Sequence, residues 1–189
     1  MKRVFLLFIG ILIICVSCQN ELLDPNSEML AAEKSAKYEK TKTYQIKGWV
    51  TVIPDWESPM FTCTPEDLGI EFCSRGWVAG HENILGTIVQ EQSTYEKVSC
   101  EVTMTEDGPV VHNVVRSDIL RTNGNRTVII CHMYINVATG DIWGQNELIS
   151  GTGRFEGITG TTHILQAKMI PETGGITWKV AGFVNLVLK

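Results

Sequence analysis

The sequence lacks most of the motifs by which enzymes and nucleic-acid-binding proteins are usually recognised. It has no Gly-x-Ser-x-Gly nucleophile elbow and no phosphate-cradling loop, and its 4 histidines form neither His-x-His nor His-Glu-x-x-His. Basic residues do not cluster, and the formal net charge is −5. These absences argue against a serine hydrolase, a phosphate-binding loop, a histidine metal site and a nucleic-acid partner. We therefore predict no catalytic motif, no metal and no cofactor.

Long apolar runs are also scarce, and the single one lies at the start, from Val4 to Val16, directly after Lys2 and Arg3. As a helix this run rises about 20 Å, which is short of the ~30 Å hydrocarbon core of a bilayer. A positive start followed by a short apolar run is typical of a signal peptide, which we place at residues 1–17. Of 16 basic residues, 14 then remain beside 21 acidic ones, a formal charge of −7.

The apolar run ends at a cysteine that is preceded by a small residue, in Cys15-Val16-Ser17-Cys18. This segment resembles the lipobox of bacterial lipoproteins, although Cys15 stands where leucine is usual. The resemblance implies that Cys18 becomes the lipidated N-terminus and that two acyl chains anchor the protein in the bacterial cell envelope. Because Gln19 is not the aspartate that retains such proteins at the inner membrane, we expect the outer membrane. The alternative is ordinary signal-peptide cleavage, which leaves Cys18 as a thiol.

Residues 18–42 are polar and show no strand alternation. Glu28 to Lys40 contains good helix formers, but its apolar positions are too few for a buried stripe. We interpret residues 18–42 as the lipidated N-terminus and a tether that holds the folded domain off the membrane. A helix that binds a partner is the alternative.

From residue 43 to residue 189 the pattern changes to strands separated by turn residues such as Asn123-Gly124 and Gly174-Gly175. An apolar fraction of 44% supports a folded core. About eight antiparallel strands without a long helix predict an all-β fold, a single antiparallel β-barrel around a filled interior. A sandwich or a lipocalin-like barrel is the alternative. The expected strands are 43–53, 77–79, 84–93, 96–106, 110–120, 127–136, 142–150, 161–169 and 177–188.

A glycine-rich motif narrows the choice of barrel. It consists of Gly151, Gly153, Phe155, Gly157 and Gly160, and its glycines permit a compact loop in which the phenylalanine closes the barrel end. This Gly-Thr-Gly-x-Phe-x-Gly-x-x-Gly pattern resembles the allene oxide cyclase-like barrels, which include plant dirigent proteins and uncharacterised bacterial secreted proteins. Residues 77–86 are a looser match to a strand start of the bacterial members. The resemblance implies a barrel over residues 43–189 and carries over no catalytic residue.

Four cysteines remain after Cys18, and none of them forms Cys-x-x-Cys, so a zinc or redox site is not indicated. An even number of cysteines in an exported protein predicts disulfides. We expect Cys63–Cys73, which would fix the irregular segment 55–76. Cys100, flanked by Val98 and Val102, and Cys131 lie in expected strands and either pair across the wall or remain buried thiols.

Three residues are candidates for ligand binding. Trp56 lies in the irregular segment, where a binding role is most plausible, and Trp77 and His81 lie in the 77–86 segment. We assign Trp49 and Trp178 to the core. The pattern favours a lipid-anchored barrel that binds a small apolar ligand or an envelope partner. A cyclase or isomerase acting in the barrel cavity is the alternative, and it requires an open cavity with a desolvated His or Glu inside.

Overall fold

The computed structural model describes residues 40–188, a domain built almost entirely of strands. The predicted signal peptide, Cys18 and nearly all of the tether lie outside these residues. In the described part of the chain no helix combines the length and the apolar character needed to cross a bilayer. The strands are β1 (Thr41–Pro54), β2 (Met60–Thr62), β3 (Glu71–Cys73), β4 (Arg75–Glu82), β5 (Gly86–Thr87), β6 (Thr94–Thr105), β7 (Gly108–Leu120), β8 (Arg126–Asn136), β9 (Ile142–Gly151), β10 (Thr159–Ile170) and β11 (Gly175–Val187).

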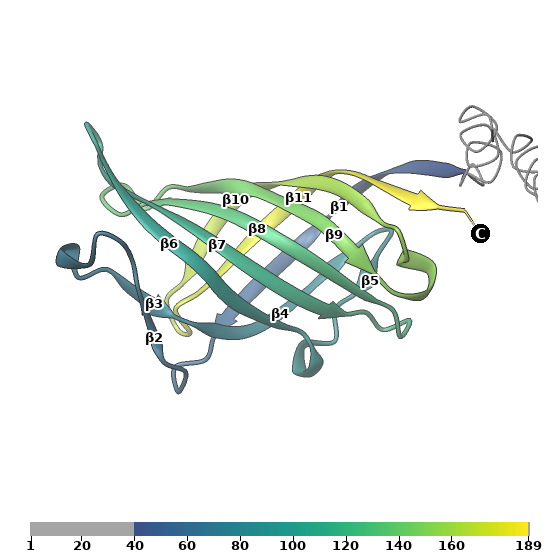
Figure 1. Cartoon of the computed structure of the whole chain (residues 1–189), viewed down its shortest axis with the longest axis horizontal. Coiled ribbons are helices and arrows are strands. Elements are labelled where there is room, and N and C mark those ends of the chain that lie inside the picture. Colours follow the sequence, from purple (N-terminus) through teal and green to yellow (C-terminus); the bar gives the residue numbers. More distant parts are fainter. Residues whose placement is uncertain (1–39, 189) are drawn as a thin grey trace, which may run out of the picture. The chain divides into compact units, whose positions relative to one another are not determined.

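Eight strands pair antiparallel in a closed ring (Figure 1). The order is β1-β11-β10-β9-β8-β7-β6-β4, and β4 pairs back onto β1 from Gly48 opposite Glu82 to Pro54 opposite Gly76. Closure leaves none of these strands as an unpaired sheet edge. The prediction of a single antiparallel barrel of about eight strands is confirmed.

Side chains alternate between the inside and the outside of the barrel. On β8, Thr127, Ile129, Cys131, Met133 and Ile135 are buried, and the residues between them are partly exposed. This alternation follows from the two-residue period of a strand and assigns one parity of each strand to the core. Of the two tryptophans assigned to the core, Trp178 is 4% exposed, as predicted, whereas Trp49 is 49% exposed on the outer face, so that assignment was wrong.

The glycine-rich motif closes one end of the barrel. It contains the short 3-10 helix η3 (Gly153–Phe155), in which Phe155 is fully buried together with Ile158. Gly153 and Gly157 have φ angles of 58° and 73°, in the left-handed region that favours glycine. The motif therefore makes a tight loop whose aromatic side chain fills the core at that end.

Two segments differ from the expected strands. Residues 84–93, expected as one strand, form only the two-residue β5 and the 3-10 helix η2 (Gln90–Gln92). Leu85 and Ile88 in this segment are buried because it packs into the gap between β4 and β7, so its apolar residues indicated burial and not a strand. The segment from 55 to 76, expected to be irregular, contains the β2–β3 hairpin and the 3-10 helix η1 (Glu66–Leu68).

Candidate functional site: a cavity at the open end of the barrel

The barrel interior is hollow at the end opposite the glycine-rich motif, which corrects the expectation of a filled interior. A cavity of about 440 Å³ lies inside, a size suited to a small organic molecule. Its walls are mainly aliphatic and aromatic side chains from most strands of the ring. They include Val50, Val52, Val78, Ile119, Ile129, Met133, Ile135, Ile176 and Trp178.

Exposed apolar side chains surround the opening of this cavity. Trp56, Met60, Val137 and Met169 all line the cavity and are 65%, 47%, 51% and 59% exposed. The indole Nε1 of Trp56 donates a hydrogen bond to the main-chain oxygen of Thr173, at 3.0 Å, in the turn between β10 and β11. The β2–β3 hairpin lies at this end of the barrel (Figure 1). An apolar ligand would therefore meet apolar surface before it reaches the interior.

A β-bulge brings one lysine into the cavity. The pairing of β6 with β7 shifts register between Lys97 and Ser99, which leaves Val98 as the extra residue, 55% exposed on the outside. Since a bulge shifts the alternation by one residue, Lys97 and Cys100 both point inward although they are three residues apart. The sequence does not reveal Lys97 as a cavity residue, because Val98, Cys100 and Val102 share one parity, which predicts that Lys97 faces solvent.

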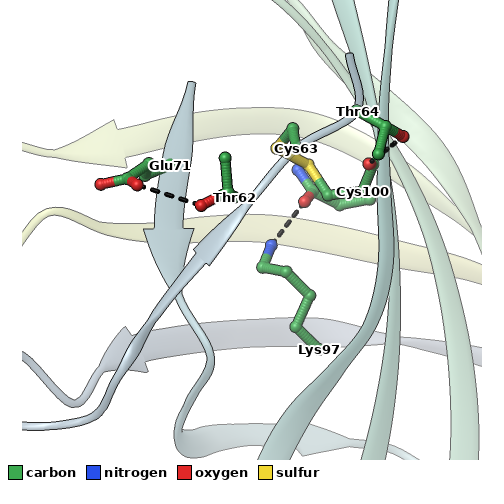
Figure 2. Close-up of a disulfide and its surroundings, with 7 residues drawn as sticks. Thr62, Cys63, Thr64, Glu71, Lys97 and Cys100 are labelled. Carbon is green, nitrogen blue, oxygen red and sulfur yellow. Dashed lines mark hydrogen bonds between the residues drawn. A yellow bond between two sulfur atoms is a disulfide. The ribbon is translucent and has the colours of Figure 1, made fainter. Parts of the chain in front are cut away.

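Lys97 is 9% exposed, and its ammonium group contacts neutral partners. Its Nζ donates a hydrogen bond to Asn113 Oδ1 on β7 and lies 4.5 Å from the centre of the Phe72 ring on β3. Figure 2 shows the lysine reaching inward from the strand that also carries Cys100. The amide dipole and the aromatic face each attract a cation, so these contacts orient the ammonium group in the cavity.

Burial changes the proton affinity of the ionisable groups around Lys97. It lowers the pKa of Lys97 from 10.5 to about 8, because the charged amine loses hydration. Burial also raises the pKa of Cys131 to about 12 and raises the pKa of Tyr95, since both would become anions. The pKa of Cys73 is raised by burial and by the nearby Asp55 carboxylate. The cavity therefore holds one cationic amine among neutral thiol and phenol groups near pH 7.

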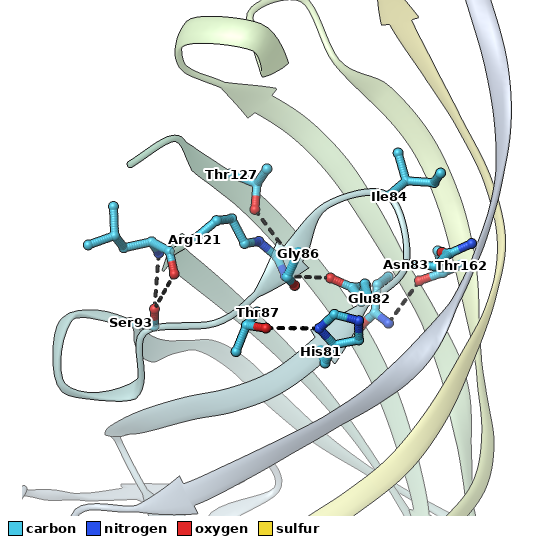
Figure 3. A network of polar contacts seen from close by, with 12 residues as sticks. His81, Glu82, Asn83, Ile84, Gly86, Thr87, Ser93, Arg121, Thr127 and Thr162 are labelled. Atoms are coloured by element: carbon cyan, nitrogen blue, oxygen red, sulfur yellow. Dashed lines mark hydrogen bonds and ion pairs between the residues drawn. The ribbon is translucent and has the colours of Figure 1, made fainter. Parts of the chain in front are cut away.

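Deeper in the barrel, a second charged pair forms the floor. Glu82, which lines the cavity, lies 2.7 Å from Arg121, and both side chains are almost completely buried. Beside this ion pair, Arg121 donates hydrogen bonds to Thr127 Oγ1 at 3.3 Å and to the main-chain oxygen of Gly86 at 3.5 Å (Figure 3). Its Nε has no hydrogen-bond partner in the described part of the chain. The floor is thus polar, and its two opposite charges are paired.

The disulfide joins Cys63 to Cys100, so the expected Cys63–Cys73 pairing was wrong (Figure 2). The chain at Thr64 pairs parallel with β6, and the main-chain N–H of Thr64 donates a hydrogen bond to the main-chain oxygen of Cys100 at 3.0 Å. This pairing places Cys63 against Cys100. Cys73 instead lies opposite Met60 in the β2–β3 hairpin, away from the Cys63 position.

The other two cysteines, Cys73 and Cys131, are buried and free. Cys100 pairs with Asn113, which pairs with Met133, so Cys131 lies two strands away from Cys100. Strands are about 4.8 Å apart, so this separation is too large for a disulfide. Of the two possibilities left open for Cys131, the buried thiol is the one observed.

The three predicted ligand-binding residues are not brought together. Trp56 lines the cavity opening, but Trp77 and His81 are not among its lining residues. Both lie on the parity of β4 that faces outward, opposite to the buried Val78 and Glu82, and His81 Nδ1 instead contacts Thr87 Oγ1 at 2.9 Å.

The remaining histidines lie outside the cavity lining as well. On the outer wall, His112 Nε2 is 3.2 Å from His132 Nδ1, and the His112 ring stacks on Tyr134 with centroids 4.4 Å apart. Burial and the neighbouring His132 lower the pKa of His112. Within residues 40–188 no group of three or more His, Cys, Asp or Glu side chains is arranged to hold a metal ion.

The fold resembles that of solved structures, whereas the sequence matches no known family. No protein-family model matches the chain, and no curated protein matches it. Among solved structures, the chain is similar to the pterocarpan synthase dirigent protein, with a TM-score of 0.41 and 14% sequence identity over 79% of this chain and 88% of that chain.

Proposed function

We propose that the barrel is a binding module that holds one small, mainly apolar ligand in its interior. The observation that carries this proposal is the cavity of about 440 Å³ with aliphatic walls and an apolar rim. Burying apolar ligand surface yields about 25 cal/mol per Å², and a preformed cavity limits the ordering that opposes binding. Filled interiors are the norm in proteins, so an open volume of this size favours a ligand site.

The proposal includes the location expected from the sequence. Acyl chains on Cys18 would hold the barrel at the bacterial envelope, on the outer membrane, and the following residues would act as the spacer. This part is supported by the lipobox resemblance of Cys15 to Cys18.

Ligand binding is tested by reducing the cavity. Native mass spectrometry of the purified protein should show a bound small molecule, and an apolar fluorescent dye should bind with a stoichiometry of one. Ile129→Trp places a bulky ring in the cavity and should weaken dye binding at least tenfold, whereas Ile149→Trp, on the exposed side of β9, should leave it unchanged. Unchanged binding in a folded Ile129→Trp variant would exclude the interior as the site. Thermal unfolding of both variants checks the fold.

Lipid anchoring is tested separately from binding. The native protein should incorporate labelled palmitate and partition into the detergent phase of a detergent extraction, and Cys18→Ala should abolish both. Labelling that persists in Cys18→Ala would contradict the anchor without affecting the ligand proposal.

Chemistry inside the cavity is the alternative function, as a cyclase or isomerase. It is favoured by one observation, the buried Glu82 carboxylate at the cavity floor. That carboxylate is already engaged by Arg121, which favours a structural role. The two functions are distinguished by analysing the ligand after prolonged incubation with the protein. An unchanged ligand supports binding, and a conversion that Glu82→Gln abolishes supports catalysis.

A further inference from the structure

The ammonium group of Lys97 has no negatively charged partner in the barrel. Three ion pairs are present in residues 40–188, and each of them uses an arginine: Arg75–Asp55, Arg121–Glu82 and Arg126–Asp118. The hydrogen-bond acceptor of Lys97 is the neutral amide of Asn113, and the group above it is the uncharged ring of Phe72. A buried charge without a counter-ion is costly, because neutral dipoles only partly replace its hydration.

The other ionisable groups that face the cavity do not supply the negative charge that would neutralise Lys97. Glu82 is taken by Arg121, and Glu71 lies at the rim, where it accepts a hydrogen bond from Thr62 at 3.0 Å. Tyr95, Cys73 and Cys131 resist ionisation, since burial raises their pKa values. The interior of the barrel therefore carries one unmatched positive charge, above a floor whose charges are paired.

We propose that Lys97 binds the anionic head group of an apolar organic acid whose hydrocarbon part lies along the aliphatic wall of the cavity. The inference rests on the proposed ligand-binding function and adds the chemical class of the ligand. Asn113 and Phe72 hold Nζ in place for the acid group, and the apolar side chains around them exclude water, which strengthens the charge-assisted contact. A ligand of this class would supply the counter-charge that the barrel lacks.

Three probes with one chain length separate the contributions of charge and apolar surface: decanoate, decan-1-ol and decylammonium. Binding to the purified full-length protein is measured by isothermal titration calorimetry at pH 7. We expect decanoate to bind at least tenfold more tightly than decan-1-ol, and decylammonium to bind more weakly than both. Lys97→Met should remove the preference, so that decanoate binds no more tightly than decan-1-ol to this variant. Lys179→Met, on an exposed lysine of β11, is the matched control and should retain the preference.

The unmodified protein provides a second test that does not depend on a variant. Decanoate affinity should fall several-fold as the pH rises from 7 to 9, because Lys97 loses its proton near pH 8, whereas decan-1-ol affinity should stay constant. Equal affinities for decanoate and decan-1-ol at pH 7, or a preference that survives in Lys97→Met, would overturn the inference and leave the ligand-binding function intact. Failure of all three probes and of the apolar dye to bind would overturn both.

Discussion

The two ends of the barrel differ in how a buried cation is partnered. At the closed end, Arg121 is fully buried and paired with Glu82 at 2.7 Å, and Phe155 fills the space nearby. At the open end, Lys97 is nearly as buried but has a neutral amide and an aromatic ring as partners, beside an unfilled cavity. A charge that only supports the fold is expected to be neutralised within the fold. The contrast therefore agrees with a stabilising role for the pair at the closed end, and it supports the proposal that the open end binds a ligand.

The largest effect should come from separating the pair at the closed end. Arg121→Met leaves Glu82 buried without its partner and should lower the free energy of unfolding by about 4 kcal/mol, measured by urea denaturation at pH 7. The double variant Arg121→Met with Glu82→Gln removes both charges and should recover most of the loss. A loss below about 1 kcal/mol in the single variant would mean that this pair does not stabilise the closed end.

Replacing an aromatic side chain by alanine should lower the free energy of unfolding more at the closed end, which is filled, than at the open end, which is hollow. Phe155→Ala opens a void in a filled region and should cost about 3–4 kcal/mol in the same assay. Phe72→Ala, next to space that is already empty, should cost about 1–2 kcal/mol, because little new void forms. Equal losses at the two positions would contradict the difference in packing between the ends.

Removing the unpaired cation should stabilise the protein. Lys97→Met should raise the free energy of unfolding by roughly 3 kcal/mol at pH 7, because burial lowers the pKa of Lys97 from 10.5 to about 8 and each pKa unit corresponds to about 1.4 kcal/mol. The folded pKa, about 8, lies below the unfolded value of 10.5, so the ammonium form costs stability in full below pH 8. The gain over the parent protein should therefore shrink as the pH rises from 8 to 10.5. A gain that does not change with pH would argue against this origin.

The smallest effect is expected on dye affinity, when a tryptophan at the opening and a tryptophan on the outer wall are each replaced by alanine. Trp56→Ala should weaken dye binding about fivefold, or roughly 1 kcal/mol, because its ring covers the cavity opening. Trp77→Ala should leave the affinity unchanged, since Trp77 faces outward on β4. Fluorescence titration of both variants gives the comparison directly, and equal weakening would place the dye outside the barrel.

The fold was predictable because its signals are local. Strand alternation, turn glycines and the motif around Phe155 each act over a few residues, and most predicted strands agree with the structure within about two residues at each end. The exception was segment 84–93, where Leu85 and Ile88 are apolar because they fill a gap between strands.

The site was less predictable because it depends on non-local geometry. Lys97 faces inward through a bulge at Val98, and a bulge leaves no clear trace in the alternation of a single sequence. The Cys63–Cys100 bond likewise depends on where Thr64 lies against β6, which residue spacing does not determine. Trp56 stands in a segment without regular alternation, where binding residues often occur, and it does line the cavity, while its role in binding stays a prediction.

The opening of the barrel is held by a covalent bond on one side and by a hydrogen bond on the other. On one side, Cys63–Cys100 joins the loop end of the β2–β3 hairpin covalently to β6, so the distance between the hairpin and the wall is fixed there. On the other side, the Trp56 ring is held to the β10–β11 turn by a hydrogen bond to Thr173, which is readily broken and remade. Displacing the Trp56 ring would therefore cost less free energy than displacing the hairpin at Cys63, because it breaks one hydrogen bond and no covalent bond.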